Sequence, residues 1–324
     1  MNIRPATHSG SWYSSDAEKL SSQLLQFLGS NDVVSGARVV ISPHAGYTYC
    51  GSTMGKAYGA LDLFGVKRIF ILGPSHHIYF KNKGLLSGFS ELSTPAGSLV
   101  VDTATVSALV QQHEGFELMD PEVDCDEHSL EMQYPMLHAT LQKRKIDPKS
   151  VTVVPIMVSH NSARVDYRLG KILSEFVKDP TNAFIVSSDF CHWGRRFNFT
   201  GYVGDVNEVQ EALAEDTEIE SLTARSKLSH HQVPIWKSIE ILDKFAMSIL
   251  SQEKPHDKYD LWKHYLEVTG NTVCGEKPIG VMLCALSQDK SSKVQFEWPG
   301  YSQSSQVSSV MDSSVSYGAG YCRI

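Results

Sequence analysis

The sequence lacks the features of several common protein classes. Its 324 residues contain no long run of lysine and arginine, and 29 basic against 36 acidic residues give a formal net charge of −7. Because such a chain offers no complementary charge to phosphate groups, we expect it to bind neither nucleic acid nor a membrane surface. No apolar stretch approaches the roughly 20 residues that span a bilayer, and the N-terminus lacks the apolar segment of a secretory signal. We therefore expect a cytoplasmic protein without membrane insertion, and access to the nucleus stays open.

Cysteine and glycine motifs are also missing. The six cysteines are scattered and form no Cys-x-x-Cys pair, which predicts reduced thiols rather than a disulfide framework. No Gly-x-x-x-x-Gly-Lys-Ser/Thr loop occurs, so we expect no nucleotide cofactor. Ser75 follows an apolar segment, but its surroundings do not read Gly-x-Ser-x-Gly, which argues against a serine hydrolase.

The pattern that is present is typical of an α/β fold. Hydrophobic residues make up 42% of the chain and charged residues 20%, as in folded globular proteins. Apolar, β-branched segments are continuous rather than alternating, as in strands buried on both faces, at 38–42, 68–72, 151–158 and 183–187. Helical patterns lie between or after them, at about 16–28, 103–113, 128–142, 162–178 and 234–250. This alternation predicts a central, mostly parallel or mixed sheet with helices on both faces.

The domain organisation follows from the same pattern. No linker is visible, so we expect a single domain over residues 1–324. The stretch at about 205–229 is acidic and poor in large apolar residues, which predicts a surface insertion with a partial helix. The segment 302–316 is rich in serine, as flexible tails are, but its valines and the tyrosines that follow favour late strands that complete the sheet.

Histidine follows three of the four predicted strands. His44 comes after the first strand, His76 and His77 after the second, and Asp189 and His192 after the fourth. Because the carboxyl ends of parallel strands meet at one edge of the sheet, we expect these side chains to line a common crevice. A metal ion is the commonest organiser of clustered imidazoles, although a lone histidine at a strand end is usually an ordinary turn residue. These residues alone leave a metal site and an acid–base site open.

Further candidates surround these histidines. Glu127 and His128 open a predicted helix whose acidic first turn is explained by the helix dipole alone, and the alternative is that both turn inward to support the crevice. Trp12, Tyr49 and Trp193 are aromatic residues that could form the walls of a binding crevice, although core packing is the commoner fate of such residues.

Longer motifs lie along nearly the whole chain. They are His8-Ser9-Gly10-Ser11-Trp12-Tyr13, Pro43-His44-Ala45-Gly46-Tyr47, Gly73-Pro74-Ser75-His76-His77, Asp126-Glu127-His128-Ser129, Ser188-Asp189-Phe190-Cys191-His192-Trp193-Gly194, Val273-Cys274-Gly275 and Ser316-Tyr317. In type and order these segments resemble the motifs of the Memo family, which is named for mediating cell motility.

The resemblance implies a fold similar to the class III extradiol dioxygenases, whose non-haem iron is held by two histidines and a glutamate. By this resemblance His44 and His76 match the histidine ligands, and Cys274 stands in the place of the glutamate. His192 matches the catalytic histidine, and Asp189 lies beside it. A thiolate in place of a carboxylate favours copper or zinc, and iron stays open.

Two functions are therefore implied. The first, which we favour, is a protein of motility, cytoskeletal or invasive-growth signalling and redox control. Its crevice would bind copper or iron, with zinc as a further candidate, and also signalling proteins or phosphotyrosine peptides. The second is a metal-dependent oxidoreductase in which His192 acts as general acid and base, oriented by Asp189. Whether the chain is an enzyme stays open at this point.

Overall fold

The computed structural model describes residues 2–30, 32–254, 257–289 and 294–324. Its centre is a sheet in which the strands run in the order β1-β5-β6-β8-β3-β9-β2-β14-β10, with β13 paired to β14. The strands are β1 (Ile3–Arg4), β2 (Ala37–Ser42), β3 (Arg68–Pro74), β4 (Gly84–Leu86), β5 (Glu91–Thr94), β6 (Gly97–Val101), β7 (Phe116–Leu118), β8 (Thr152–Val158), β9 (Asn182–Ser187), β10 (His192–Trp193), β11 (Gly201–Tyr202), β12 (Glu220–Ser221), β13 (Phe296–Gln303) and β14 (Ser314–Arg323).

The four strands predicted from continuous apolar segments form the middle of this sheet. β8, β3, β9 and β2 are neighbours in that order and all three pairings are parallel. Every residue of β2 and β9 is buried, which explains why their sequences do not alternate. β14 adds an antiparallel neighbour to β2, so the sheet is mixed. The predicted α/β class, with a mostly parallel sheet between helices, is confirmed.

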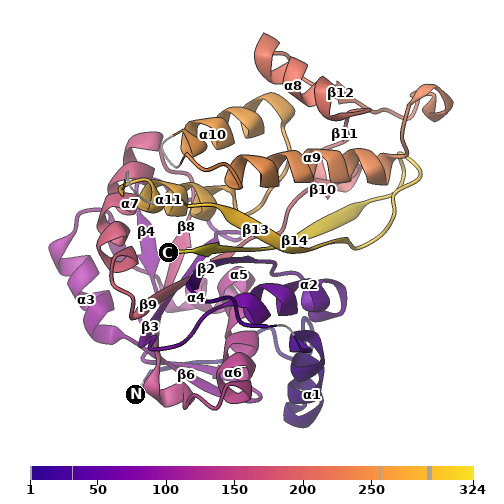
Figure 1. The fold of residues 1–324 in the computed structure, drawn as a ribbon. Coiled ribbons are helices and arrows are strands. Elements are labelled where there is room, and N and C mark those ends of the chain that lie inside the picture. The colour runs from indigo at the N-terminus through magenta and orange to yellow at the C-terminus, as the bar shows by residue number, and fades with distance from the viewer. Residues whose placement is uncertain (1, 31, 255–256, 290–293) are drawn as a thin grey trace.

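Helices cover both faces of the sheet (Figure 1). α2 packs on β2 and β14, whereas α7 and α11 pack on each other and on β9. The helices are α1 (Ala17–Leu28), α2 (Tyr47–Ala60), α3 (Thr103–Gln112), α4 (Pro121–Asp126), α5 (His128–Glu131), α6 (Gln133–Lys143), α7 (Ala163–Val177), α8 (Val206–Glu215), α9 (Ile235–Leu250), α10 (Lys258–Thr269) and α11 (Glu276–Leu286), with short 3₁₀ turns at Pro148–Ser150, Arg195–Phe197 and Leu228–His230. In the described part of the chain, none of these helices combines the length and the apolar character that crossing a membrane requires.

One predicted helix is divided in two. The pattern at 128–142 predicted a single helix, but α5 ends at Glu131 and α6 begins at Gln133. Pro135 lies in the first turn of α6 and has no N–H to donate to the carbonyl of Glu131, so a continuous helix would lose that bond. Because of this break, α5 has a direction of its own, and it packs against β3.

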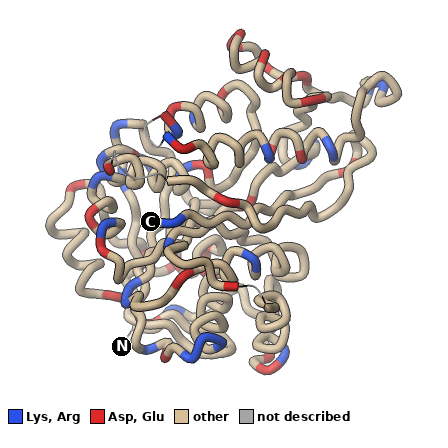
Figure 2. The backbone as a smooth tube through the Cα atoms, viewed as in Figure 1, with Lys and Arg blue, Asp and Glu red and all other residues tan. Residues whose placement is uncertain are grey.

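The acidic stretch lies at the periphery. Asp205 caps α8, and the acidic residues Glu208, Glu211 and Glu215 of this helix are exposed. Figure 2 shows acidic positions along α8 in red. β12 pairs with β11 in a separate two-stranded sheet. α8 packs on α9 and α10, and Figure 1 shows it at the edge of the molecule, far from β2 and β3.

Candidate metal centre

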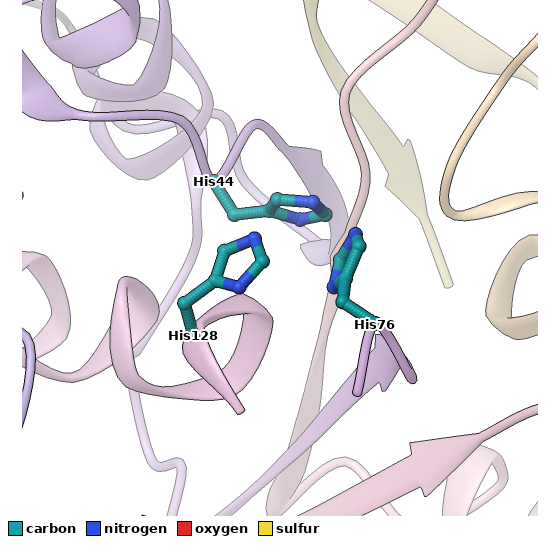
Figure 3. A group of neighbouring side chains, drawn as sticks. All are labelled: His44, His76 and His128. Carbon is teal, nitrogen blue, oxygen red and sulfur yellow. The ribbon is translucent and has the colours of Figure 1, made fainter. Parts of the chain in front are cut away.

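Three histidines from separate parts of the chain meet beside the central sheet (Figure 3). His44 follows β2, His76 follows β3, and His128 is the first residue of α5. Their ring centroids are separated by 5.2 Å (His44–His76), 5.5 Å (His44–His128) and 4.2 Å (His76–His128). One ligand atom from each ring lies within 4.8 Å of the other two. The three imidazoles are therefore close enough for one ion to bind all of them.

Hydrogen bonds fix the proton of His44 on Nδ1. This nitrogen lies 2.8 Å from Ser187 Oγ. The Ser187 hydroxyl donates its only proton to the carbonyl of Ser129 (2.7 Å), so it accepts from His44. Nε2 of His44 is then unprotonated and has a lone pair for a metal. Metal-binding histidines are commonly held in this way through the other ring nitrogen.

Glu127 holds the other two rings. Its Oε1 lies 2.8 Å from His76 Nδ1 and 3.6 Å from His128 Nδ1, and its Oε2 accepts the His76 backbone N–H at 2.7 Å. Burial acts to raise the pKa of Glu127, but the hydrogen bonds and charges of the two histidines outweigh it and lower the pKa to about 2. The ionised carboxylate can only accept, so Nδ1 of His76 carries a proton, and in the neutral ring Nε2 is the nitrogen with a lone pair. Glu127 and His128 both turn inward.

A second group of ligand atoms shares His44. It consists of His44, Asp189 and Cys274, whose ligand atoms also lie within 4.8 Å of one another. Cys274 Sγ lies 3.1 Å from His44 Nε2, and the Asp189 carboxylate accepts the His44 backbone N–H at 2.8 Å. The three residues predicted to hold one ion, His44, His76 and Cys274, are thus divided between two adjoining groups, with His44 in both.

A glycine brings the sulfur to this position. Gly275 donates its N–H to Ser188 Oγ at 3.0 Å, just beyond the end of β9. A Cβ atom at Gly275 would lie only 2.2 Å from the Cβ of Ser188. Only glycine permits this approach, and the approach carries the neighbouring Cys274 to within reach of His44.

The Gly275→Ala variant is expected to lose about 1–3 kcal/mol of unfolding free energy, because the added methyl overlaps packed atoms. Urea unfolding of the metal-free protein measures this change. Gly88→Ala is the matched control, because a Cβ at Gly88 meets no atom within 4 Å. Equal stability of the two variants would show that the loop is not held as tightly as the structure indicates.

Burial sets the protonation of the centre. It lowers the pKa of His44 well below the ordinary value, and His76 and His128 add to the effect. Burial, with the charge of His76, lowers the pKa of His128 to about 3. Burial also raises the pKa of the Cys274 thiol well above its ordinary value. At neutral pH the buried imidazoles are neutral and ready to bind a metal, whereas the thiol would have to release its proton on binding.

These shifts predict a loss of stability in mild acid. Below pH 6.5 an unfolded histidine binds a proton, while folded His128 does not until about pH 3, so the unfolded state is favoured as the pH falls. From pH 7 to 5 this one group destabilises the metal-free fold by up to about 2 kcal/mol. Urea midpoints across this range measure the slope, which should flatten in His128→Gln. An unchanged slope in that variant would contradict the assignment.

The other predicted residues lie around the centre in different ways. His192 Nδ1 lies 2.9 Å from the Phe190 carbonyl and 3.2 Å from that of Thr272, and these contacts orient its ring. His77 is exposed, with its ring 6.0 Å from that of His128. Trp12 stacks on His128 with 4.4 Å between centroids, and Tyr49 is 65% exposed. Trp193 is fully buried and donates to the Gly201 carbonyl, so its ring offers no surface to a ligand, contrary to the prediction.

Glu131 supports the centre and was not anticipated. This fully buried carboxylate accepts hydrogen bonds from Tyr13 (2.7 Å), from the backbone of His8 (2.8 Å) and from Arg4 (2.5 Å). These contacts hold the N-terminal segment that carries Trp12 against α5. The partners are 118 to 127 residues away in the sequence, so no local pattern could reveal them.

Known proteins are similar in sequence to this chain over nearly its whole length. A family described as Memo-like protein matches residues 4–321. The "MEMO1 family protein MHO1" of Saccharomyces cerevisiae is 58% identical, over 100% of both chains. "Protein MEMO1" of Mus musculus is 38% identical over 98% of this chain and 96% of its own. A crystal structure of the uncharacterized protein JW3007 from Escherichia coli K12 superposes loosely on 86% of this chain and 98% of its own, with a TM-score of 0.42 and 10% identity.

Proposed function

The chain belongs to the Memo family, and from this premise we propose that it is a metal-binding protein of motility-linked signalling and redox control, acting in the cytoplasm. The ion would be copper or iron, with zinc as a further candidate, held in the crevice by His44 together with His76 and Cys274. When bound, such an ion supplies a Lewis-acidic or redox-active centre.

The protonation of His44 is the observation that supports this proposal most strongly. Its Nδ1 proton is committed to Ser187, and its Nε2 lone pair is directed to a space shared with another imidazole and a thiol. Imidazole and thiol donors suit copper, zinc and iron rather than magnesium or calcium. The rings of His44 and His128 are largely removed from solvent, and the desolvation energy that this costs would be offset by a bound ion.

Metal content tests the proposal. The wild-type protein, purified under reducing conditions and incubated separately with Cu(I), Fe(II) and Zn(II), should retain about one equivalent of at least one ion by elemental analysis. His76→Ala should lower that content, and His160→Ala should not, because His160 is exposed and contacts Tyr79 rather than the centre. Failure of the wild-type protein to retain any of the three ions would refute the proposal.

Peptide recognition is the signalling part of the proposal. Tyr49 and His77 are exposed, and they suit contact with a partner such as a phosphotyrosine peptide. Fluorescence polarisation with a labelled phosphotyrosine peptide should show weaker binding to Tyr49→Ala and to His192→Ala than to the wild-type protein. Equal affinity of all three proteins for the peptide would show that the peptide does not bind at Tyr49 or His192.

A metal-dependent oxidoreductase is the second candidate, and the state of His192 favours it. Because two carbonyls accept from Nδ1, this nitrogen carries a proton, and in the neutral ring Nε2 is the nitrogen with a lone pair. Such a nitrogen can take a proton from a substrate bound beside the centre. Oxygen consumption by the metal-loaded protein with a panel of catechols tests turnover. If no catechol raises the rate of oxygen consumption, the result would favour the first proposal, a metal-binding protein without this activity.

A further inference from the structure

We infer that helix α9 carries a second interaction surface, which binds a segment of a partner protein that combines acidic with large apolar side chains. Two hollows, of about 280 and 500 Å³, lie on either side of this helix. Both are lined by Lys244 and Ser248, so they adjoin at these two residues, and together they form what we call the α9 surface. No residue that lines them belongs to the metal centre, so this inference goes beyond the proposed function.

The first hollow lies between α8 and α9 and has an apolar floor. Ile241 and Phe245 of α9 are half-buried there, and Val206 of α8 is 46% exposed. Ile241 and Phe245 are four residues apart, so they lie on the same side of α9. Apolar residues that gather at the surface within a polar rim are typical of a site for another protein.

The second hollow lies between α9, α2 and β13 and has aromatic walls. The Trp298 ring rests on Gly320, where a Cβ would lie 2.7 Å from the ring. Its N–H donates to the Met247 carbonyl at 3.2 Å, and the Tyr301 hydroxyl donates to the Asp243 carboxylate at 2.9 Å. Because these polar groups are engaged within the fold, the two rings offer mainly apolar surface to a partner.

Lysines surround these apolar areas and make the surface basic. Lys56 is exposed and pairs with no acidic group among the described residues. Its stem lies over Gly300, where a Cβ would lie 2.7 Å from Lys56 Cδ, so the ammonium group stands at the rim of the second hollow. Lys237 and Lys244 share a single carboxylate, that of Glu240, at 2.7 and 2.6 Å. Three lysines thus face one acidic residue, on a chain whose net charge is −7.

The combination of charge and apolar surface defines the partner. Acidic side chains would pair with Lys56 and Lys244, since complementary charge guides encounter and selects the partner. Lys244 and Ser248 stand between the hollows. A segment that crosses α9 therefore places an acidic residue beside Lys244 and a large apolar residue on either side of it. Nucleic acid is a poorer fit, because the apolar floors offer nothing to a phosphate backbone.

Selection from a library of short random peptides displayed on phage tests the inference. Panned on the full chain, the library should yield peptides enriched in acidic residues together with leucine, phenylalanine or tryptophan. Fluorescence polarisation with a selected peptide should show binding at least about 10-fold weaker to Lys56→Glu/Lys244→Glu, because like charges would then face each other. Lys171→Glu is the matched control, because Lys171 is exposed on α7, and it should leave the affinity unchanged.

Val206→Asp tests the apolar part of the surface. Val206 is the first residue of α8, where an acidic side chain suits the helix dipole, so the thermal unfolding of this variant should stay close to that of the wild-type protein. Its carboxylate would stand in the first hollow and should weaken peptide binding by at least about 10-fold, since an apolar side chain would be buried against a charge. His44→Gln should leave peptide binding unchanged, because it alters only the metal centre.

Each contrary result overturns the inference. A library that yields no peptide above the background of an unrelated protein would show that the α9 surface binds no such segment. Selected peptides that bind Lys56→Glu/Lys244→Glu with unchanged affinity would lie elsewhere, and peptides lost in His44→Gln would lie at the metal centre. If light scattering showed a dimer that the double lysine variant abolishes, a second copy of the chain would occupy the surface. Metal content is measured separately, so failure here leaves the proposed function untouched.

Discussion

The His44→Ala variant is expected to lose both Co(II) and Cu(I) binding, with each affinity falling by about 100-fold or more. His44 belongs to both ligand groups, so no complete set of three ligands remains without it. The loss of one ligand removes a metal–nitrogen bond, which contributes more than the 10- to 100-fold attributed to residues that only support ligands. Titration of the metal-free protein with each ion measures the effect.

The control must separate metal loss from misfolding, because His44 is only 1% exposed and its truncation leaves a cavity. His44→Gln fills most of that space, and it should lose metal equally while its urea midpoint stays closer to that of the wild-type protein. Retention of near wild-type affinity for both ions in His44→Ala would exclude this residue from the centre.

The Arg4→Ala variant is expected to lose about 3–5 kcal/mol of unfolding free energy, because removing one partner leaves buried charges unpaired. The Arg4 side chain is 1% exposed and lies 2.8 Å from Asp124 and 2.5 Å from Glu131, two carboxylates that are also buried. Its guanidinium further donates to the Glu127 carbonyl at 3.1 Å. Urea unfolding of the metal-free protein gives the value.

A surface arginine offers the matched comparison for Arg4. Arg323 pairs with Glu297, but its side chain is 53% exposed, so Arg323→Ala should cost less than about 1 kcal/mol. Similar losses in the two variants would mean that the buried cluster contributes no more than a surface pair. We also expect Arg4→Ala to weaken metal binding. Glu131 would lose its hydrogen bond from Arg4, and the segment that carries Trp12, which stacks on His128, would be held less firmly.

The middle of the sheet could be predicted because each of its strands carries its own signal. The segments that became β2, β3, β8 and β9 are continuous runs of apolar residues, and strands buried on both faces need such runs. The antiparallel position of β14 could not be predicted in the same way, since its register against β2 depends on residues nearly 300 positions away. The division between α5 and α6 was missed although Pro135 was visible in the sequence.

The site could be predicted only in part. His44, His76 and Asp189 follow strands whose carboxyl ends meet at one edge, so general rules of parallel sheets bring them together. Cys274 carries no such signal, because a lone cysteine is usually a small buried apolar residue, and only the family resemblance singled it out. Its place beside His44 depends on the close approach of Gly275 to Ser188, which no local pattern reveals.

The division of the ligands into two groups was likewise beyond the sequence. His128 begins a helix, and its neighbour Glu127 has the ordinary character of an acidic residue at a helix start. Glu127 and His128 become part of the centre because Glu127 contacts His76, which lies 51 residues earlier in the chain. Such a contact depends on how α5 packs on β3, and packing of that kind follows from the complete fold.

Anomalous diffraction from crystals of the cobalt-loaded full chain, recorded at the cobalt absorption edge, tests the central claim most directly. The account predicts one dominant peak within about 2.0–2.4 Å of His44 Nε2, with His76 and Cys274 as its further ligands. Dominant peaks at outlying histidines such as His160 or His231, with none at His44, would contradict it.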